Sequence, residues 1–420
     1  MTYYRFILCL CVFPFFLSCQ NDNDLNEKEK QENTVPNDYS PIPLSKSEQE
    51  ISMQNLEFAF RFFKKCNRLL TDKSQMVFSP LSAYWAVSMA SSGANSTTLQ
   101  EFMEVLGCNE LQNDDLHNYN RKLIIALTEI DNTCELGIAN SVWIDKEFEV
   151  LDSYTEGLEK FYEAELFLED LKNSSAVTAI NDWCNEKTNG RIPKIVNKMD
   201  AETLLLLNSL YFKGIWKNVF DEKNTWKEAF TNEDLSITET DFMNLTLATD
   251  FVEHDLFTLA ELPYGNCAYS MTVLLPNEGI DVNRCIEALN AESWATCMSE
   301  KQDKLLHIKL PKFNVKAVGE ELASVLMKMG LEEAFSSKAD FSRLSKKDVM
   351  MTAINQSVSF SIDEKGTEAS AITDIEFGAG FGENSNKPQI LDFHVNRPFI
   401  FIIKEQSTNS VLFMGKIAEL

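Results

Sequence analysis

The chain has 420 residues, of which 44% are hydrophobic and 24% charged, so it can bury a large core. This composition excludes a wholly disordered chain, a collagen and a protein with many membrane spans. Asp and Glu number 64 against 38 Lys and Arg, and the formal net charge of −26 repels phosphate backbones. We therefore expect no nucleic-acid partner. Length alone favours two domains, although one α+β domain of this size remains possible.

The ten cysteines do not form a recognisable framework. Cys9, Cys11 and Cys19 lie in the N-terminal apolar segment, and the other seven are scattered without a C-x-x-C pair. This distribution argues against a disulfide scaffold and against structural zinc, so we expect most of the seven to be small buried side chains.

The N-terminus is typical of an exported protein. Arg5 is the only charge before the apolar run 6–16, so residues 1–18 are predicted to be a signal peptide. Leu17-Ser18-Cys19 resembles the bacterial lipobox, which implies a lipid on Cys19. Residues 19–47 are polar and are predicted to form a disordered, lipid-anchored tether. The expected location is the outer membrane or cell surface of a bacterium, with secretion as the alternative if Cys19 carries no lipid.

The body begins with predicted helices and continues with predicted strands. An apolar stripe with helical period starts near Glu48. Further helices are expected at 80–92, 97–106, 115–131 and 155–164. Strand-like runs follow at 136–144, 204–212, 269–275, 305–315, 357–362, 399–403 and 411–414. No repeat or second linker divides this region, so the order of elements favours one large α+β domain.

The sequence nominates no catalytic site. The four histidines have no metal-ligand spacing, and there is no G-x-S-x-G elbow and no P-loop. Gly378, Gly380 and Gly382 form G-x-G-x-G, but neither a preceding strand nor a following helix is predicted there. We therefore expect a protein that is not an enzyme and that uses no metal and no cofactor.

The segment from Thr367 to Ala379 alternates with a period of two. Thr367 and every second residue after it carry no charge, whereas the residues between them include Glu368, Asp374 and Glu376. Small side chains and a glycine-rich end make the segment a poor core anchor. Two interpretations remain open on this pattern: an exposed loop with the pattern of a latent strand, or an ordinary edge strand running into a loop.

The hinge at 364–373 closely resembles that of the serpins, and other blocks share the resemblance. They follow the family's order and are the stretches 77–82, 208–216, 261–264, 310–313, 334–342 and the C-terminal signature Phe393-His394-Val395-Asn396-Arg397-Pro398-Phe399-Ile400-Phe401-Ile402-Ile403. The resemblance covers about 48–420 and implies one serpin domain rather than two domains. It also implies an α+β fold with three β-sheets, about eight to nine helices and an exposed reactive-centre loop at about 364–392.

The resemblance further implies a mechanism. A target serine protease cleaves the loop, which then inserts as a new strand into the central sheet while still acyl-linked to the protease. At roughly 3.3 Å per residue, about fifteen inserted residues move the protease by about 50 Å. The expected product is a covalent complex between a target protease and a monomeric suicide-substrate inhibitor.

Site residues follow from matched positions. The hinge would comprise Glu364, Gly366, Thr367, Glu368, Ala369, Ser370 and Ala371. The breach, where insertion begins, would be the ion pair of Lys312 with Glu364 beside Trp216. The shutter, which holds the sheet closed, would be Ser79, Ser82 and Asn208, with Gln356 where the family usually has a histidine. An amide both donates and accepts, so the shutter can still form.

The forward count from Glu364 places the reactive bond at Gly380-Phe381, with Phe381-Gly382 as the alternative. Such residues suit elastase-like or chymotrypsin-like proteases, and papain-like proteases are further candidates. Two rival functions remain. A non-inhibitory serpin acting as a binding or carrier protein would be expected to have bulky, charged or proline residues in the hinge, which this chain lacks. A hydrolase is the other rival, and generic ester and peptide substrates would detect it.

Overall fold

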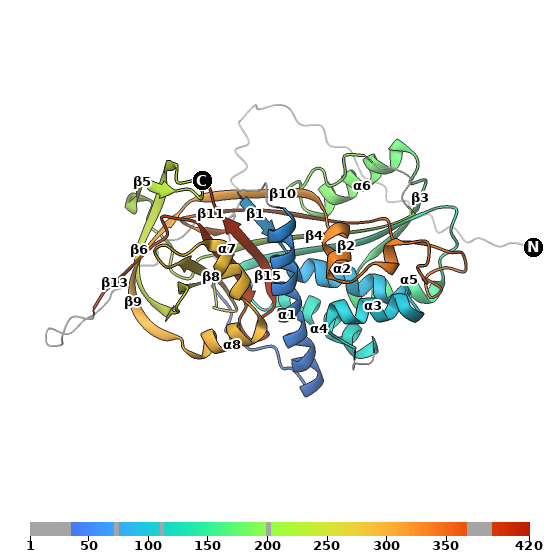
Figure 1. Cartoon of the computed structure of the whole chain (residues 1–420), viewed down its shortest axis with the longest axis horizontal. Helices are drawn as coiled ribbons and strands as arrows, with labels where there is room; N and C mark the ends of the chain where they lie inside the picture. The colour runs from blue at the N-terminus through green and yellow to red at the C-terminus, as the bar shows by residue number, and fades with distance from the viewer. Residues whose placement is uncertain (1–34, 71–74, 110–112, 199–202, 368–388) are drawn as a thin grey trace, which may run out of the picture. The chain divides into compact units, whose positions relative to one another are not determined.

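The computed structural model describes residues 35–70, 75–109, 113–198, 203–367 and 389–420 (Figure 1). These residues contain nine α-helices and fifteen strands. The helices are α1 (Lys46–Leu69), α2 (Pro80–Gly93), α3 (Ser96–Leu106), α4 (Asn113–Glu129), α5 (Asp152–Tyr162), α6 (Ser174–Lys187), α7 (Val282–Ala288), α8 (Ala291–Ser299) and α9 (Ala323–Met329). Two 3₁₀ turns, Glu222–Asn224 and Glu333–Phe335, complete the helical elements.

The described strands form two sheets. The six-stranded central sheet has the order β10 (Phe313–Glu321), β11 (Ala353–Asp363), β12 (Gly366–Thr367), β4 (Leu204–Ile215), β2 (Cys134–Asp145) and β3 (Glu165–Glu169). The nine-stranded sheet contains β1 (Gln75–Phe78), β15 (Val411–Ile417), β14 (Phe399–Glu405), β8 (Tyr269–Pro276), β7 (Phe257–Pro263), β6 (Ile237–Glu253), β9 (Gln302–Pro311), β13 (Leu391–His394) and β5 (Thr225–Thr231).

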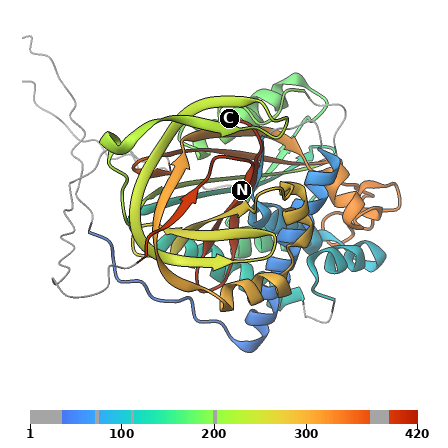
Figure 2. The same ribbon diagram turned by 60° about the vertical axis from the view of Figure 1, so that its left-hand side comes forward.

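The three sheets implied by the resemblance correspond to these two hydrogen-bonded sheets because β6 is long enough to serve both halves of the larger one. Its 17 residues pair with β5 near the start, with β9 along the middle and with β7 at the end. Figure 2 shows the β5–β6 hairpin curving over one end of the molecule. The predicted α+β class is confirmed.

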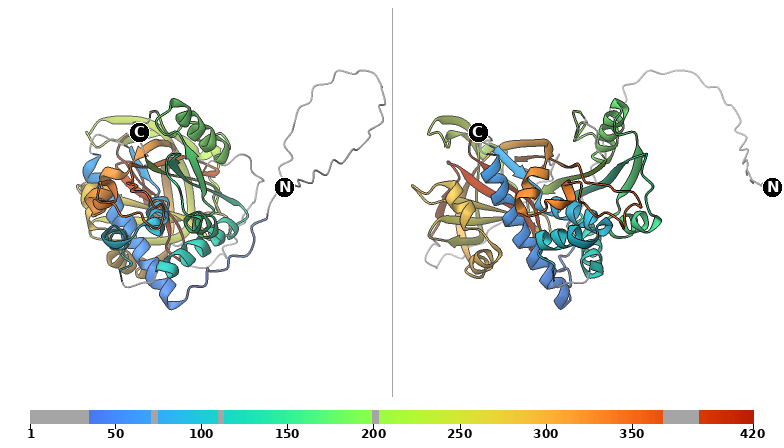
Figure 3. Two further views of the ribbon diagram at one scale, coloured as in Figure 1. Left: turned by 90° about the vertical axis from the view of Figure 1, so that its right-hand side faces the viewer. Right: turned by 45° about the vertical axis from the view of Figure 1, so that its right-hand side comes forward.

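Both faces of the central sheet are covered. On one face, α6 packs Ile180 and Trp183 against Trp143 of β2 and Leu207 of β4. On the other face lies the main core, to which α1 and α2 contribute. Figure 3 shows α6 on the opposite side of the sheet from α2–α5. The long apolar runs of β2 and β4 follow from this arrangement, because a strand covered on both faces needs no polar face.

Helix α2 lies in the centre of this core. It starts with Ser79 as N-cap, whose hydroxyl accepts from the Ser82 backbone N–H at 3.2 Å, and with Pro80 in the first turn. Thirteen of its fourteen residues are buried, so it has no solvated stripe. Its N-terminus carries two of the predicted shutter residues beneath the central sheet.

One sequence prediction needs correction at its C-terminal end. The tether was predicted to run to residue 47, but the described residues 35–45 pack against the domain, and Ile42 is buried. Asn37 and Asn132 exchange backbone-to-side-chain hydrogen bonds of 3.1 and 3.0 Å, and Tyr39 donates to Glu405 at 3.3 Å. The polar composition of this segment led to the prediction of disorder. Its order comes from hydrogen bonds between asparagine side chains and particular loops, and such bonds leave no periodic pattern in a sequence. Residues 1–34, including Cys19, lie outside the described residues.

None of the described helices combines the length and the apolar character needed to cross a bilayer.

Candidate functional site: the hinge and the β11–β4 seam

The central sheet divides between β11 and β4, a boundary that we call the seam. The two strands pair in parallel from Ala353 opposite Leu205 to Val358 opposite Leu210. Beyond this stretch they separate, and β12 lies between them. Thr367 pairs with Ile362 on one side and with Gly214 on the other. The first residues of the predicted hinge therefore form a short strand between β11 and β4.

Gly366 is required by this geometry. Its φ is +146°, which residues with a Cβ rarely adopt, and a Cβ here would lie 2.0 Å from the Gly214 carbonyl oxygen. The chain leaves β11 at Asp363 and returns as β12 within three residues, so the reversal depends on a residue without a side chain.

Thr367 is fully buried, and its side chain has a partner. Its Oγ1 lies 2.7 Å from the hydroxyl of Tyr264, which is also buried. Burial raises the pKa of Tyr264 well above its ordinary value, so the phenol stays neutral. The Tyr264 ring stacks on Trp216 with centroids 4.4 Å apart and an interplanar angle of 12°. The sequence blocks contained Tyr264, but nothing in them assigned it to the hinge.

The structure brings the predicted breach residues together. Lys312 Nζ lies 2.8 Å from Glu364 Oε2, and Thr225 Oγ1 donates to Glu364 Oε1 at 2.7 Å. Burial raises the pKa of Glu364, but the hydrogen bonds from Lys312 and Thr225 outweigh burial and leave the pKa below its ordinary value. Trp216 Nε1 donates to the Asp363 carbonyl at 2.9 Å. The turn between β11 and β12 is thus fixed from both sides.

Lys312, Glu364 and Thr225 help to line an open, polar cleft of about 470 Å³. Four of its lining residues are acidic and two are lysines, with Thr225 as the seventh: Glu222, Asp241, Asp363, Glu364, Lys312 and Lys365. The cleft lies at the foot of the hinge and is acidic on balance.

The predicted shutter residues also meet, with Gln356 at the centre. Gln356 Oε1 accepts from the Ser79 backbone N–H at 2.9 Å. Its Nε2 donates to the Ser79 carbonyl at 2.8 Å and to Ser82 Oγ at 2.9 Å. Gln356 pairs with Asn208 across the seam, so this cluster joins β11, α2 and β4 at the place where the strands would have to part.

The polar cluster continues beyond the four residues predicted from sequence. Ser82 Oγ donates to Asn208 Oδ1, and Asn208 Nδ2 donates to Asn140 Oδ1 on β2. Asn140 Nδ2 in turn donates to the Tyr162 carbonyl at the end of α5, at 2.9 Å. Sequence analysis missed Asn140, although its position opposite Asn208 in the register of β2 and β4 would have identified it once the strands were aligned.

A histidine lies at the far end of this network. His117 Nδ1 is 2.5 Å from the Tyr162 hydroxyl, and burial lowers the pKa of His117 to about 4. Its imidazole is therefore neutral near pH 7. The shutter itself contains no group that titrates, because an amide stands at residue 356.

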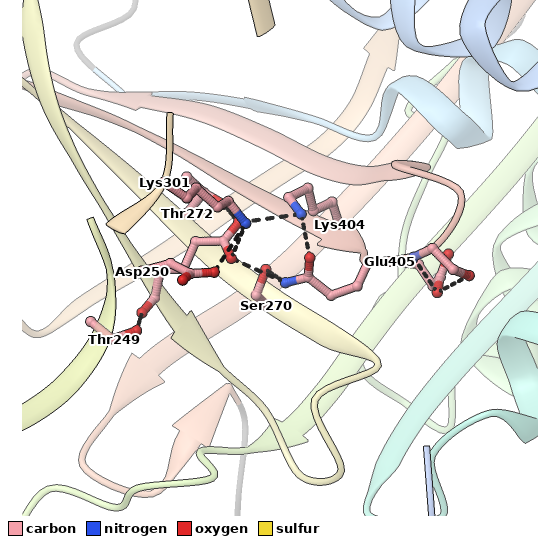
Figure 4. Close-up of polar contacts among 10 residues, drawn as sticks. Thr249, Asp250, Ser270, Thr272, Lys301, Lys404 and Glu405 are labelled. Carbon is pink, nitrogen blue, oxygen red and sulfur yellow. Dashed lines mark hydrogen bonds and ion pairs between the residues drawn. The ribbon is translucent and has the colours of Figure 1, made fainter. Parts of the chain in front are cut away.

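An ion network in the nine-stranded sheet holds β7, the strand that leads to Tyr264 (Figure 4). Buried Glu261 accepts from Lys301 Nζ at 2.7 Å, and Lys404 Nζ lies 3.3 Å from its other carboxylate oxygen. Burial raises the pKa of Glu261, but the two lysines outweigh it and lower the pKa overall. Gln406 donates to Ser270 at 2.7 Å and links the network to β8.

Several predicted site residues lie outside the described part of the chain. These are Cys19, the reactive-bond residues Gly380 and Phe381, and the hinge residues Glu368, Ala369, Ser370 and Ala371. Among the described side chains, no three His, Cys, Asp or Glu residues gather as metal ligands would. Six of the seven described cysteines are buried, as predicted, and Cys267 is partly exposed.

Comparison with known proteins decides the family. The model of the family described as "Serpin (serine protease inhibitor)" matches residues 53–420. This chain is a serpin. A serine protease inhibitor of Mus musculus is 30% identical over 424 residues, covering 98% of this chain and 97% of that protein. Serpin A3-2 of Bos taurus is 31% identical, with coverage of 87% and 88% respectively.

Solved serpin structures share the fold. The thermophilic serpin tengpin in its native state superimposes with a TM-score of 0.81 at 28% identity, covering 92% of this serpin and 98% of tengpin. Human thyroxine-binding globulin in complex with thyroxine also reaches a TM-score of 0.81, at 26% identity, covering 89% of this serpin and 99% of that chain. The second neighbour carries a small molecule, so the fold alone does not settle what a serpin does.

Proposed function

We propose that this serpin inhibits serine proteases as a suicide substrate by inserting its cleaved loop along the β11–β4 seam. One observation carries the proposal: β12 lies between β11 and β4, so a strand that continues from Thr367 has its entrance already open. The residues that follow Thr367 at period two are uncharged, which suits burial on the inner face of the sheet.

The chemistry belongs to the protease. Its serine Oγ attacks the carbonyl carbon of Gly380, the Gly380–Phe381 bond breaks, and the amine of Phe381 leaves with a proton. The acyl ester keeps the protease attached to Gly380. Insertion then extends β12 down the seam and separates the paired stretches 353–358 and 205–210. The hydrogen bonds of Gln356 to Ser79 and Ser82 resist this step until the strands part.

The experiment is incubation with pancreatic chymotrypsin, pancreatic elastase and papain, followed by boiling in detergent and denaturing electrophoresis. A band at the summed mass of serpin and protease, less the C-terminal fragment that cleavage releases, supports trapping. If every protease that cuts the loop yields only cleaved serpin, the non-inhibitory alternative, a binding or carrier protein, is favoured instead; thyroxine-binding globulin is a neighbour that binds a small molecule. Mass spectrometry of the released fragment tests the bond: a fragment that starts at Phe381 or Gly382 is expected, and one that starts beyond Asn384 would contradict the count.

We also propose that the protein is anchored to a bacterial envelope by a lipid on Cys19, a proposal that rests on the sequence alone. Cys19→Ala should lose metabolic lipid labelling and membrane retention, while Cys9→Ala serves as the matched control. Label that persists on the Cys19→Ala protein would remove the lipoprotein proposal.

A further inference from the structure

Strand β5 spans the two points at which the described chain enters and leaves the reactive-loop region. Thr225 bonds to Glu364, three residues before the end of β12. Glu228 Oε2 lies 3.2 Å from His394 Nε2, on the strand β13 that follows the loop. The first four residues of β5 therefore lie between the two ends of the reactive-loop region.

One of these four residues, Trp226, is an exposed tryptophan. The chain has six tryptophans, and five of them are at most 6% exposed, whereas Trp226 is 47% exposed. Removing that much aromatic surface from water stabilises a complex, and tryptophan is enriched among residues that dominate binding energies. In the part of the chain that the structure describes, β5 pairs with no strand other than β6. The backbone N–H of Thr231 donates to the Asn396 carbonyl at 2.9 Å, but this bond lies at the far end of β5 from Trp226.

The Trp226 side chain is held in place before any partner arrives. Its Nε1 donates to Glu228 Oε1 at 2.6 Å, and Glu228 also accepts from Lys309 Nζ at 2.7 Å. Lys309 Nζ lies 6.0 Å from the indole centroid. The one polar atom of the indole is therefore satisfied within the serpin, and little rotamer entropy is left to lose on binding.

We propose that Trp226 is the centre of a second docking surface that contacts the target protease while the loop occupies its active site. This inference rests on the proposed function and specifies the partner further. The contacting group on the protease is a basic side chain on the rim of the active-site cleft. Lys309 already lies 6.0 Å from the indole centroid, but its ion pair of 2.7 Å with Glu228 offsets its charge. The exposed indole therefore still favours a cation through its π-face, and the neighbouring cleft beyond Thr225 is acidic on balance.

The test separates docking from trapping. Chymotrypsin and elastase with the catalytic serine replaced by alanine can bind the loop but cannot form an acyl bond. Their dissociation constants are measured for the wild type, Trp226→Ala, Trp226→Phe and Ile237→Ala. Ile237 is the matched control because it is 70% exposed on the same hairpin but lies at the opposite end of β5.

Trp226→Ala should weaken binding to at least one of the two inactive proteases by about tenfold or more. Trp226→Phe should retain most of the affinity, and Ile237→Ala should stay within about twofold of the wild type. Binding by Trp226→Ala within twofold of the wild type for both proteases, or no binding by the wild type to either, would overturn the docking surface. Tighter binding by Trp226→Ala would overturn it too, because the indole would then be covering or competing with the loop.

Two further readouts keep the conclusions apart. If Trp226→Ala melts at a lower temperature than the wild type, the docking surface is tested instead by comparing the dissociation constants of Trp226→Phe and Trp226→Leu. Only the π-face differs strongly between these two variants, so weaker binding by Trp226→Leu is expected and equal binding would overturn the docking surface. With the active proteases, Trp226→Ala should still form the detergent-stable complex at an unchanged stoichiometry but a lower association rate. Absence of that complex for the wild type itself would reject the proposed function rather than the docking surface.

Discussion

Replacing Thr367 with arginine tests whether the observed position of β12 is the start of insertion. Thr367 is fully buried between β11 and β4, and its hydroxyl bonds to Tyr264 at 2.7 Å. The new guanidinium would have to be buried without a carboxylate partner in the sheet, or β12 would have to leave the seam. We expect β12 to leave, because two residues of strand pairing hold it there.

The magnitude follows from two contributions. Losing the hydroxyl contact costs about 1 kcal/mol, and burying an unpaired guanidinium costs several kcal/mol more. A combined cost of about 4 kcal/mol in the first step of insertion would slow that step by roughly a thousandfold. Deacylation would then precede insertion, and the protease would be released with the serpin cleaved.

The assay is the number of serpin molecules consumed per protease inhibited, with electrophoresis of the products. Thr367→Arg should be cleaved as fast as the wild type but should yield little detergent-stable complex. Thr367→Val is the matched control, because it keeps the shape and removes only the hydroxyl, and it should still inhibit. A Thr367→Arg variant with the wild-type yield of complex would refute insertion through this position.

Three further predictions concern residues that support the site. Gln356→Ala removes three buried hydrogen bonds and should lower the free energy of unfolding by about 2–4 kcal/mol. It should also speed the spontaneous loss of inhibitory activity. Unchanged denaturant midpoints would contradict a role for Gln356 in holding the seam closed. The pKa of Glu364 is below its ordinary value in the folded state, so the stability that Glu364 contributes is complete at neutral pH and is lost as the pH falls through the folded pKa. Glu364→Gln should therefore lower the melting temperature near pH 7 and flatten the decline of the melting temperature towards pH 3. Parallel curves of melting temperature against pH for the variant and the wild type would count against the pairing of Glu364 with Lys312. Asn37→Ala removes hydrogen bonds of its side chain with Ile130, Asn132 and Asn266 and should lower the free energy of unfolding by about 1 kcal/mol, as measured by chemical denaturation. Ser40 is exposed, so Ser40→Ala should leave this free energy unchanged. Equal values for the two variants would mean that residues 35–45 do not stabilise the domain.

The sequence predicted the elements better than it predicted their contacts. The stripe from Ile51 to Leu69 anticipated α1 because helical periodicity is a local property. The position of β12 could not be predicted, because it depends on pairing with Gly214 and Ile362, which lie on different strands. Similarly, the contact of Tyr264 with Thr367 joins residues 103 apart in the chain.

The resemblance to serpins supplied the grouping of distant residues that periodicity could not. Lys312 and Glu364 are 52 residues apart, and only the matched blocks suggested that they would form a pair. Where the chain departs from the family pattern, at Gln356, chemistry was sufficient: an amide can donate and accept, and the structure shows it doing both. Asn140 escaped detection because its partner Asn208 is identified only by the register of two strands.

Thermal unfolding of the loop-cleaved protein tests the central claim most directly. A protease that cuts within 376–384 without being trapped provides cleaved material for comparison with the intact form. If the cleaved loop extends β12 along the seam, the completed sheet should raise the melting temperature by about 20 °C or more. At roughly 1.3 °C per kcal/mol in a domain of about 370 residues, this rise corresponds to about 15 kcal/mol of added stability. Equal melting temperatures for the cleaved and intact proteins would contradict insertion, and with it the proposed mechanism of inhibition.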